Sequence, residues 1–515
     1  MASRPIVRSL ATPTESWSRL SVFIYPADRH SLTATDRPPT PAEAQARLFH
    51  QATALPGFGG LLHQRPEYGS IGDAAFARLA SSRCRTHDPA NATLFLVSHP
   101  FAHKDWWPSA DSEYRAPLCT RLSSSLRKWR DDWQLKAENV SYMDRRGGRD
   151  HLIIAPFLMW STMGACSVGF SDHSQLGDAT RVGVDGGPTV HFHEYTETLH
   201  RSTDHRRGGA WLFAPHGNYQ TAPPLSPAVG SDTWIAGGST ADGAPSVARP
   251  LLAAYVGGAR GSASNTSQDA WVYTLRNTLL SACGGAADCG LICIEPVSQE
   301  QLGQPHVPRA VKRLIGRAFD TSSEAVCERA ARSVVRHQID TGNAAHGRAK
   351  ASFLALYANA TFCLMPPGDS PYRLAMVDAL TMGCLPVAFH PAQTSLWRLQ
   401  WASWVHEATI MLDHAAVSSG ALDVLAYLRA IPPHRVRRMR RALSANFHTI
   451  NYRTPTPHDA PQSPPLADSI EATCDVRPRP GRRDDALDVV LRSALRHAAG
   501  LDPYGEDSSE DSTEP

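Results

Sequence analysis

Short apolar runs that alternate with helical segments are the feature that most constrains the fold of this chain. Runs without polar alternation fall at 21–25, 93–98, 151–155 and 211–214, and again at 251–257, 291–294, 361–364 and 385–389. Such runs suit strands that are buried on both faces of a parallel sheet. Segments of helical character lie between or before them, at 41–55, 117–133, 270–282 and 371–382. The alternation predicts an α/β fold with parallel sheets.

Composition divides the 515 residues into two α/β units and two ends. Residues 1–20 are expected to form a flexible leader. Residues 21–240 and 241–454 are expected to form an N-terminal and a C-terminal domain, joined by a hinge rich in Gly, Ser, Ala and Pro at 226–250. The last fifteen residues carry six carboxylates. We therefore expect residues 455–515 to form a disordered, Pro-rich and acidic tail.

Charge and hydropathy exclude two broad classes of protein. A formal net charge of +2 is too small for nucleic-acid binding through a strong overall field. The basic run at 434–441 contains Val436 and Met439 at helical spacing, which predicts the exposed face of a packed helix. No apolar run reaches the roughly 18 residues that a membrane-spanning helix needs, and residues 1–20 lack the apolar core of a signal peptide.

The segment 362–391 predicts a strand, a turn, a helix and a second strand. Pro367 and Gly368 help to end the first strand, and Asp369 or Ser370 is expected to cap the helix. A helix N-terminus presents free N–H groups and a partial positive charge, which suits a diphosphate. The alternative is that these residues form only a turn and a helix cap.

Two charged residues in that helix extend the nucleotide hypothesis. Arg373 is expected in the first turn, facing solvent, where its guanidinium can fork onto phosphate oxygens. Asp378 lies five residues further on, where its carboxylate can accept hydrogen bonds from ribose hydroxyls.

The same segment resembles the C-terminal signature of the exostosin-type glycosyltransferases, family 47, and is most similar to the plant branch that includes xyloglucan galactosyltransferases. The shared pattern comprises Phe362-Cys363-Leu364, Pro366-Pro367-Gly368-Asp369-Ser370, Arg373, Asp378, Gly383-Cys384, Pro386-Val387 and Phe389-His390-Pro391. Further elements of the resemblance follow in the family's order. They are Arg85-Thr86-x-Asp88-Pro89, Gly148-Arg149-Asp150-His151, Ala214-Pro215-His216-x-Asn218-Tyr219, and Arg249-Pro250-Leu251 through Arg260, with Arg276 in the next helix.

This resemblance implies a GT-B fold, in which two Rossmann-like domains face each other across a cleft. It implies an inverting glycosyltransferase that moves a sugar from a UDP-sugar donor to a glycan or glycoprotein acceptor, with no metal and no other cofactor. The implied donor-binding residues are Arg260, Arg276, Pro367, Gly368, Asp369, Ser370, Arg373 and Asp378. Many relatives carry two adjacent arginines where this chain has Arg373-Leu374. The alternative is therefore a catalytically degenerate sugar-binding or scaffold member.

An inverting transfer needs a general base that deprotonates the acceptor hydroxyl. By analogy with GT-B enzymes the base comes from the N-terminal domain, where the candidates are Asp150, His151 and His216. For Asp150 and His151 the alternative is structural, as a carboxylate in a turn and a histidine that orients it. The cluster of His193, Glu194 and His200 gives only a weak zinc signal and is expected to be a solvated loop.

Whether the cysteines form disulfides depends on the redox state of the compartment in which the protein resides. The spacing of Cys283, Cys289 and Cys293 does not fit a zinc site, and a disulfide within the cluster is expected only if the chain enters the secretory lumen. Cys363 and Cys384 are expected to be packed core residues. The resemblance implies the Golgi apparatus and a single membrane anchor; because no anchor is visible in this sequence, we expect either a truncated gene model that lacks it or a soluble paralogue.

Overall fold

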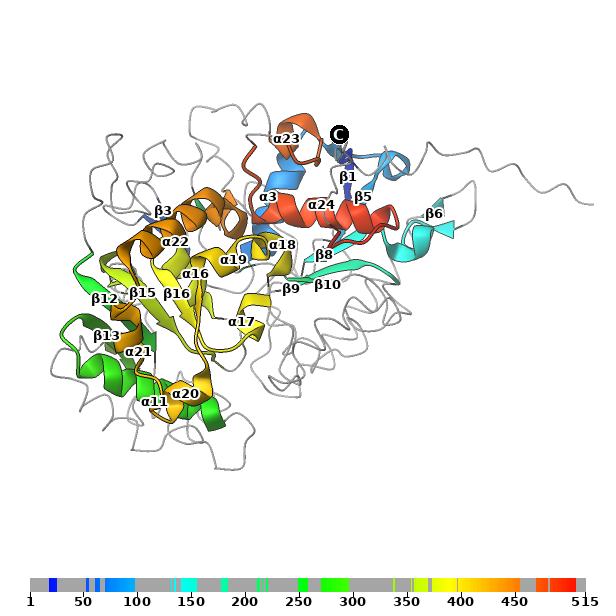
Figure 1. The fold of residues 1–515 in the computed structure, drawn as a ribbon. Coiled ribbons are helices and arrows are strands. Elements are labelled where there is room, and N and C mark those ends of the chain that lie inside the picture. The colour runs from blue at the N-terminus through cyan, green and yellow to red at the C-terminus, as the bar shows by residue number, and fades with distance from the viewer. Residues whose placement is uncertain are drawn as a thin grey trace, which may run out of the picture.

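The computed structural model describes two parallel sheets, which Figure 1 shows as blue to teal and as green to yellow arrows. The described residues are 18–25, 52–54, 61–64, 70–97, 131, 134–135, 140–154, 177–183, 211–213, 215, 219–220, 249–257, 270–295, 337–338, 353, 356–368, 373–395, 397–453, 469–479 and 482–505.

The first sheet has the strand order β10-β9-β8-β5-β1-β4, with every neighbouring pair parallel. Its strands are β1 (Val22–Ile24), β4 (Arg85–Thr86), β5 (Leu94–Val97), β8 (His151–Ile154), β9 (Thr180–Gly183) and β10 (Trp211–Phe213). The buried runs at 21–25, 93–98, 151–155 and 211–214 thus form the strands predicted for them.

The second sheet has the order β14-β13-β12-β15-β16-β17, again with every neighbouring pair parallel. Its strands are β12 (Leu251–Gly257), β13 (Cys289–Glu295), β14 (His337–Gln338), β15 (Ala360–Met365), β16 (Leu385–Ala388) and β17 (Ile410–Met411). Two parallel α/β sheets confirm the predicted fold class, while the predicted domain boundaries stay predictions.

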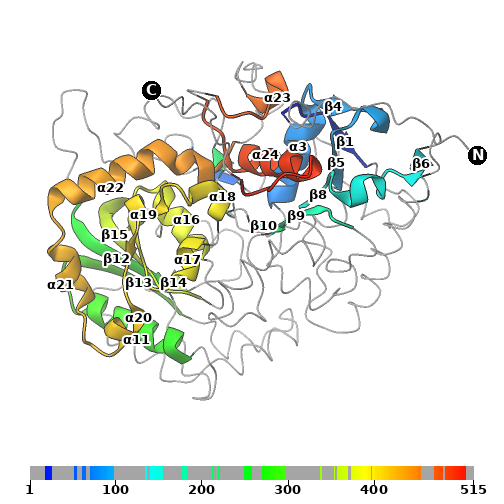
Figure 2. The same cartoon turned by 45° about the vertical axis from the view of Figure 1, so that its right-hand side comes forward.

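Helices pack against the second sheet because its strands are apolar on both faces. The helix α11 (Ala270–Gly284) contacts β12 and β13, and α16 (Leu374–Thr381) contacts β15 and β16 (Figure 2). Six further helices of the described residues follow β16 along the chain. They are α17 (Ala392–Ser395), α18 (Arg398–Trp401), α19 (Val405–Ala408), α20 (His414–Ser418), α21 (Val424–Arg429) and α22 (Pro433–Asn446).

The described residues also form two smaller sheets, one of four strands and one of two. The strands β18 (Tyr452–Arg453), β11 (Tyr219–Gln220), β3 (Leu61–Gln64) and β2 (Ala52–Ala54) form one, and β6 (Gln134–Leu135) pairs with β7 (Val140–Ser141). The helix predicted for 41–55 is wrong at residues 52–54, where antiparallel pairing with β3 holds the backbone extended. The rest of that prediction lies outside the described residues, as do residues 226–248 of the predicted hinge and nearly all of the helix predicted at 117–133.

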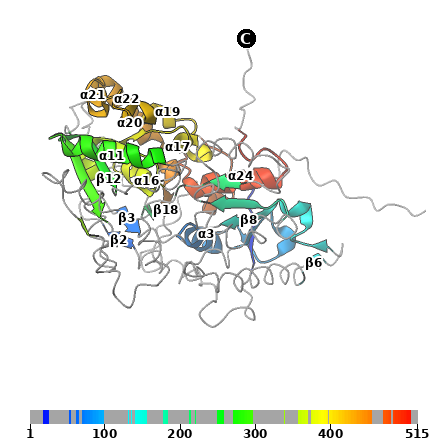
Figure 3. The ribbon, with the colours of Figure 1, turned by 90° about the horizontal axis from the view of Figure 1, so that it is seen from below.

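The prediction of a disordered tail over residues 455–515 is wrong for the described part of that segment. Residues 470–473 form α23 (Ile470–Thr473), and residues 486–498 form α24 (Ala486–Ala498). The helix α24 lies against β5, β8 and β9 of the first sheet (Figure 3). Leu487, Leu491 and Leu495 are buried there with the helix α3 (Ser70–Ser81) in one apolar cluster, and this burial orders the segment.

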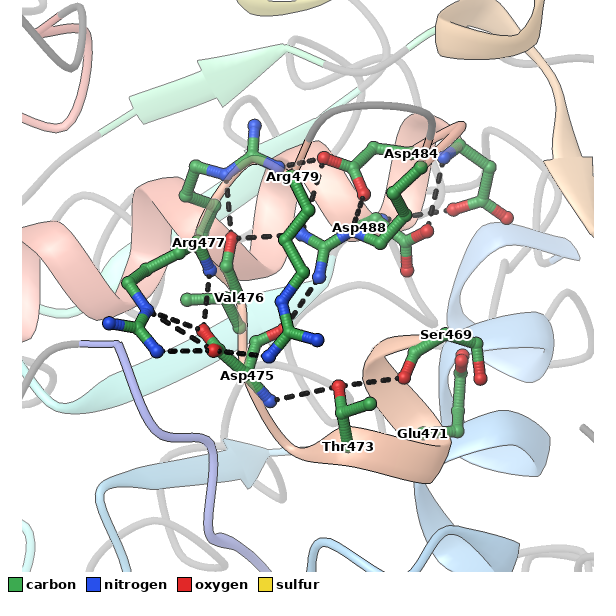
Figure 4. A network of polar contacts seen from close by, with 12 residues as sticks. Ser469, Glu471, Thr473, Asp475, Val476, Arg477, Arg479, Asp484 and Asp488 are labelled. Carbon is green, nitrogen blue, oxygen red and sulfur yellow. Dashed lines mark hydrogen bonds and ion pairs between the residues drawn. The ribbon is translucent and has the colours of Figure 1, made fainter. Parts of the chain in front are cut away.

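A polar clamp fastens the same C-terminal segment to α3. Arg78 is buried and donates to Asp485 at 2.6 Å, to Asp488 at 2.8 Å and to Glu471. Burial alone would lower the pKa of Arg78, but the three carboxylates raise it above its ordinary value. Figure 4 shows the adjoining contacts, in which Asp475 accepts from arginines further along the segment.

Three disulfides join described cysteines. Cys84 at the end of the α3 region bonds to Cys474, which adds a covalent link to the clamp. The disulfide expected within the 283–293 cluster forms between Cys283 and Cys289. Cys363 and Cys384 are buried as predicted, but they are bonded to each other rather than packed as separate thiols.

Candidate functional site at the carboxyl edge of the second sheet

The strand order of the second sheet reverses between β12 and β15. From β12 the chain crosses outward to β13 and β14, whereas from β15 it crosses the other way to β16 and β17. Open parallel sheets bind ligands beyond the carboxyl ends of the strands at such a reversal. The residues that follow Val256 and Met365 therefore define the place to look for a site.

Arg373 bridges the carboxyl ends of these two strands. Its Nη1 donates to the carbonyl oxygen of Pro366 at 2.9 Å, and its Nη2 donates to that of Val256 at 3.2 Å. Since the backbone of Arg373 is extended, α16 begins at Leu374 rather than at 371. Arg373 is the residue before the helix, so the predicted cap by Asp369 or Ser370 is wrong. Its guanidinium is half-buried and tied to two strands, which also corrects the predicted solvent-facing position.

Arg276 reaches the same place from α11. Its side chain is buried, and its Nε lies 3.4 Å from the hydroxyl oxygen of Tyr255 on β12. Burial lowers the pKa of Arg373, and the charge of Arg276 lowers it further. A side chain at Gly257 would meet the Tyr255 hydroxyl at 2.7 Å, so only glycine leaves room for this arrangement.

Asp378 and Tyr357 complete the polar cluster beneath the edge. Both side chains are buried, and within the described residues the Tyr357 hydroxyl has no hydrogen-bond partner. Burial raises the pKa of Tyr357, with the charge of Arg373 opposing and that of Asp378 adding to the rise. Two guanidiniums and one carboxylate leave a net positive charge at the strand ends. Such an excess in a partly buried site favours an anionic ligand.

Of the other predicted donor-binding residues, two are described by the structure and three are not. Pro367 is buried and Gly368 is half-buried, directly after β15 and its Pro366 carbonyl. Arg260, Asp369 and Ser370 lie outside the described residues.

Sequence reasoning missed a group of three stacked rings at the same edge. Trp271 at the start of α11 lies 4.0 Å, centroid to centroid, from His414 and 5.7 Å from His390. The Nδ1 of His390 accepts from the backbone N–H of Ala392 at 3.2 Å, so in the neutral ring the proton is on Nε2. The three rings come from three distant segments, and no local pattern in the sequence marks them as neighbours.

The candidates for the general base lie in a different environment. Asp150 and His151 are buried at the amino end of β8, away from the carboxyl edge of the first sheet. Asp150 accepts from Arg145 at 2.9 Å and lies 3.0 Å from Nδ1 of His151. The Nε2 of His151 lies 2.7 Å from the hydroxyl of Tyr25, which the sequence did not mark. This arrangement fits the structural alternative, in which the carboxylate and the histidine orient each other.

Burial by itself would raise the pKa of Asp150, but its contacts with His151 and Arg145 hold that pKa below its usual range. His216 lies outside the described residues, as does the cluster of His193, Glu194 and His200. Within the described ranges, no group of three His, Cys, Asp or Glu side chains is arranged to hold a metal ion.

Comparison with known proteins gives a family. The family model of the exostosin GT47 domain matches residues 16–399. A probable xyloglucan galactosyltransferase of Arabidopsis thaliana is 31% identical over 153 residues, 29% of this chain and 28% of that protein. The xyloglucan galactosyltransferase MUR3 of the same plant is 27% identical over 130 residues, 25% of this chain and 21% of that protein. The chain thus spans only about a quarter of the length of these curated relatives.

Solved structures resemble the chain more distantly. The α,α-trehalose 6-phosphate synthase of Burkholderia multivorans has 10% sequence identity and a TM-score of 0.35, over 84% of this chain and 93% of that one. The UDP-forming α,α-trehalose-phosphate synthase of Burkholderia vietnamiensis has 10% identity and a TM-score of 0.33, over 76% and 84%.

Proposed function

The chain belongs to the exostosin GT47 family, and from this premise we propose that it is a glycosyltransferase that uses a nucleotide-sugar donor. The observation that carries the proposal is that Arg276, through Tyr255, and Arg373, through Pro366 and Val256, both lie at the carboxyl ends of β12 and β15. Two guanidiniums at a strand-order reversal suit a diphosphate, because each can donate two parallel hydrogen bonds to its oxygens.

We propose UDP-sugar as the donor and a glycan or glycoprotein as the acceptor, with inversion at the transferred carbon. Trp271, His390 and His414 offer stacked rings beside the arginines for a nucleobase. The names of the Arabidopsis relatives support a glycan acceptor of the xyloglucan kind.

In this proposal the diphosphate leaves with its charge balanced by Arg276 and Arg373. Such charge compensation by guanidiniums makes transfer without a metal ion or another cofactor chemically reasonable. Asp378 stays a proposed acceptor for ribose hydroxyls, and Arg260, Pro367, Gly368, Asp369 and Ser370 stay proposed donor-loop residues. For the general base we favour His216, because Asp150 and His151 are buried and engaged with Tyr25 and Arg145.

The second candidate is a degenerate member that binds a sugar nucleotide without turnover. The reason to consider this alternative is Leu374, which occupies the position where many relatives have a second arginine. The contact between Arg276 and Tyr255 favours the enzyme, because it brings a second guanidinium to Arg373 from another helix. A panel of UDP-sugars with xyloglucan oligosaccharides decides between them: UDP release with some donor supports the enzyme, and UDP binding without release by any donor supports the alternative.

For localisation we propose the Golgi lumen. The disulfides Cys84–Cys474, Cys283–Cys289 and Cys363–Cys384 suit an oxidising compartment. Within the described part of the chain, no helix combines the length and apolar content that crossing a membrane requires. Expression of the tagged chain, followed by glycosidase digestion and co-localisation with organelle markers, tests the proposal: glycosylation and overlap with Golgi markers support it, and an unglycosylated protein outside the Golgi contradicts it.

A further inference from the structure

Four Asn-x-Ser/Thr sequons, the acceptor sequences for N-linked glycans, occur in the chain. Their acceptor residues are Asn91, Asn139, Asn265 and Asn359. An attached oligosaccharide is bulky and hydrophilic, so the folded protein accommodates it only where the asparagine side chain is open to solvent. The fold therefore distinguishes between these sequons.

The asparagine of the first sequon, Asn91-Ala92-Thr93, is on the surface of the protein. Asn91 is exposed and is the last residue of a short 3₁₀ helix, Pro89–Asn91, that precedes β5. Ala92 instead is buried, and its carbonyl oxygen accepts from Arg145 at 2.9 Å. The turn is thus anchored through the middle residue of the sequon, with the acceptor side chain on the outside.

The side-chain contact of Asn91 with Asp88 is compatible with a glycan. Nδ2 of Asn91 donates to Oδ2 of Asp88 at 2.9 Å, and Oδ1 of Asp88 caps the 3₁₀ helix by accepting from the N–H of Ala90 at 3.0 Å. The amide of an unmodified asparagine carries two hydrogens on Nδ2. When a sugar replaces one of them, the other still serves Asp88, so the turn keeps its hydrogen bond.

Asn91 lies at the amino edge of the first sheet. It directly precedes β5, and Ser21, which directly precedes β1, donates its N–H to Thr93 of the same sequon at 2.8 Å. Open parallel sheets bind ligands beyond the opposite, carboxyl edge. An oligosaccharide on Asn91 therefore extends away from the edge at which such a sheet binds substrates.

The other sequons have a less suitable structure or lie outside the described residues. Ser141, which completes the second, is buried, and its Oγ accepts from the N–H of Met143 at 3.2 Å. Asn359 is exposed, but it ends a helical turn and directly precedes β15. Asn265 lies outside the described residues. Of the two acceptor asparagines whose side chains are described, Asn91 alone lies in a turn between a strand and its neighbour in the same sheet.

We propose that Asn91 carries an N-linked oligosaccharide, an inference that rests on the proposed localisation in the Golgi lumen. The co-reactant is an oligosaccharide joined through a diphosphate to a lipid. Nδ2 of Asn91 forms a bond to the anomeric carbon of this sugar, and the bond from that carbon to the diphosphate oxygen breaks. The lipid diphosphate leaves, and Nδ2 gives up one proton to solvent.

The third residue of the sequon fixes when this transfer occurs. In the folded protein Oγ1 of Thr93 accepts from the N–H of Ser21 and donates to the carbonyl oxygen of Arg19 at 3.0 Å. A sequon needs this hydroxyl for recognition, and these contacts occupy it once β5 has paired with β1. The glycan is therefore added to the growing chain, and the exposed position of Asn91 lets the finished fold retain it.

Peptide mapping of the full chain, isolated from eukaryotic cells, tests the proposal without any variant. Peptide N-glycosidase in heavy-oxygen water removes a glycan and labels its asparagine, and we expect the label at Asn91 in the tryptic peptide 86–104. The same enzyme should increase the electrophoretic mobility of the chain, and Asn91→Gln should lack one glycan-dependent step. Thr93→Ser, which keeps the sequon and its hydroxyl, is the matched control and retains that step.

The outcomes separate this proposal from the proposed localisation. An unlabelled Asn91 in a chain that carries glycans at other sequons would overturn this proposal and still support entry into the lumen. A chain without any N-glycan would overturn both. Turnover of the UDP-sugar by Asn91→Gln should equal that of the wild type, and a loss of turnover in folded Asn91→Gln would contradict the placement of the glycan away from the substrates.

Discussion

Arg276 and Arg373 both interact with Tyr255: the Nε of Arg276 donates to its hydroxyl at 3.4 Å, and Tyr255 partly offsets the lowering of the pKa of Arg373 by burial. Arg276 lies on the helix that follows β12, and Arg373 lies in the segment that follows β15. Among the described residues, no carboxylate forms an ion pair with either arginine, so both guanidiniums can donate to a ligand.

Replacing Arg373 should impair both binding and folding. Arg373→Ala removes a proposed diphosphate contact, and we expect turnover to fall by about 10²-fold or more. It also removes donors from the carbonyls of Pro366 and Val256, which should cost about 1–3 kcal/mol of unfolding free energy. Calorimetric titration with UDP and urea unfolding measure the two effects. Arg435→Ala, an exposed control, should change neither, and unaltered UDP affinity in Arg373→Ala would contradict the phosphate role.

If Trp271 stacks on the nucleobase, replacing it should weaken the binding of UDP but not that of inorganic diphosphate. Trp271→Ala should weaken UDP binding by about 1–3 kcal/mol, the value of one base stacked on an aromatic ring. Binding of inorganic diphosphate should stay the same, since it has no base. Titration of both ligands checks this, with Trp271→Phe as the conservative variant that retains most of the affinity. Equal losses for UDP and diphosphate would mean that Trp271 supports the fold of the site instead.

Arg78 predicts a large effect on stability far from the site. Arg78→Leu leaves Glu471, Asp485 and Asp488 close together without their cation. Breaking a buried pair in this way typically costs about 3–5 kcal/mol. Urea unfolding measures the loss, and Arg83→Leu in the exposed turn after α3 is the control. If the free energy of unfolding fell by less than about 1 kcal/mol in Arg78→Leu, the ion pairs of Arg78 would be solvated rather than buried.

Asp150 predicts a pH dependence with a definite sign. Its folded pKa is depressed, so its carboxylate stabilises the fold above the unfolded value of about 3.9, and that stabilisation is lost as pH falls through the folded value. The stability difference between the wild type and Asp150→Asn should therefore be constant above about pH 5 and shrink below about pH 4. Urea unfolding from pH 3 to 7 measures both curves. Curves that stay parallel throughout would exclude the proposed linkage.

Removal of metal ions tests the proposed charge compensation. If Arg276 and Arg373 balance the leaving diphosphate, transfer should proceed at full rate after dialysis against EDTA. The release of UDP is the measurement, with and without added Mn²⁺. Loss of activity on chelation and its recovery with Mn²⁺ would overturn the metal-free proposal while leaving the glycosyltransferase proposal intact.

The sequence predicted the central strands well because their signal is local. The strand β12 has the bounds predicted for it at 251–257, and an uninterrupted apolar run needs no knowledge of its neighbours. Arg373 was also found from its local segment. The position of its side chain was wrong, because the contacts with Pro366 and Val256 depend on how two distant strands meet.

Other features had no local signal. Tyr255 and Tyr357 look like ordinary core residues in the sequence, and only the fold brings them to Arg373 and Asp378. The helix α24 spaces its leucines at helical intervals within a polar, Pro-rich surrounding, so composition pointed to disorder. Its order comes from burial against a sheet that begins more than four hundred residues earlier.

The return of α24 to the first sheet has a consequence for synthesis. A ribosome makes β5, β8 and β9 long before Leu487, Leu491 and Leu495 of α24, which pack against these strands. The second sheet has all its strands once Met411 has left the exit tunnel. During synthesis, the first sheet therefore gains this apolar covering only after the second sheet has all of its strands.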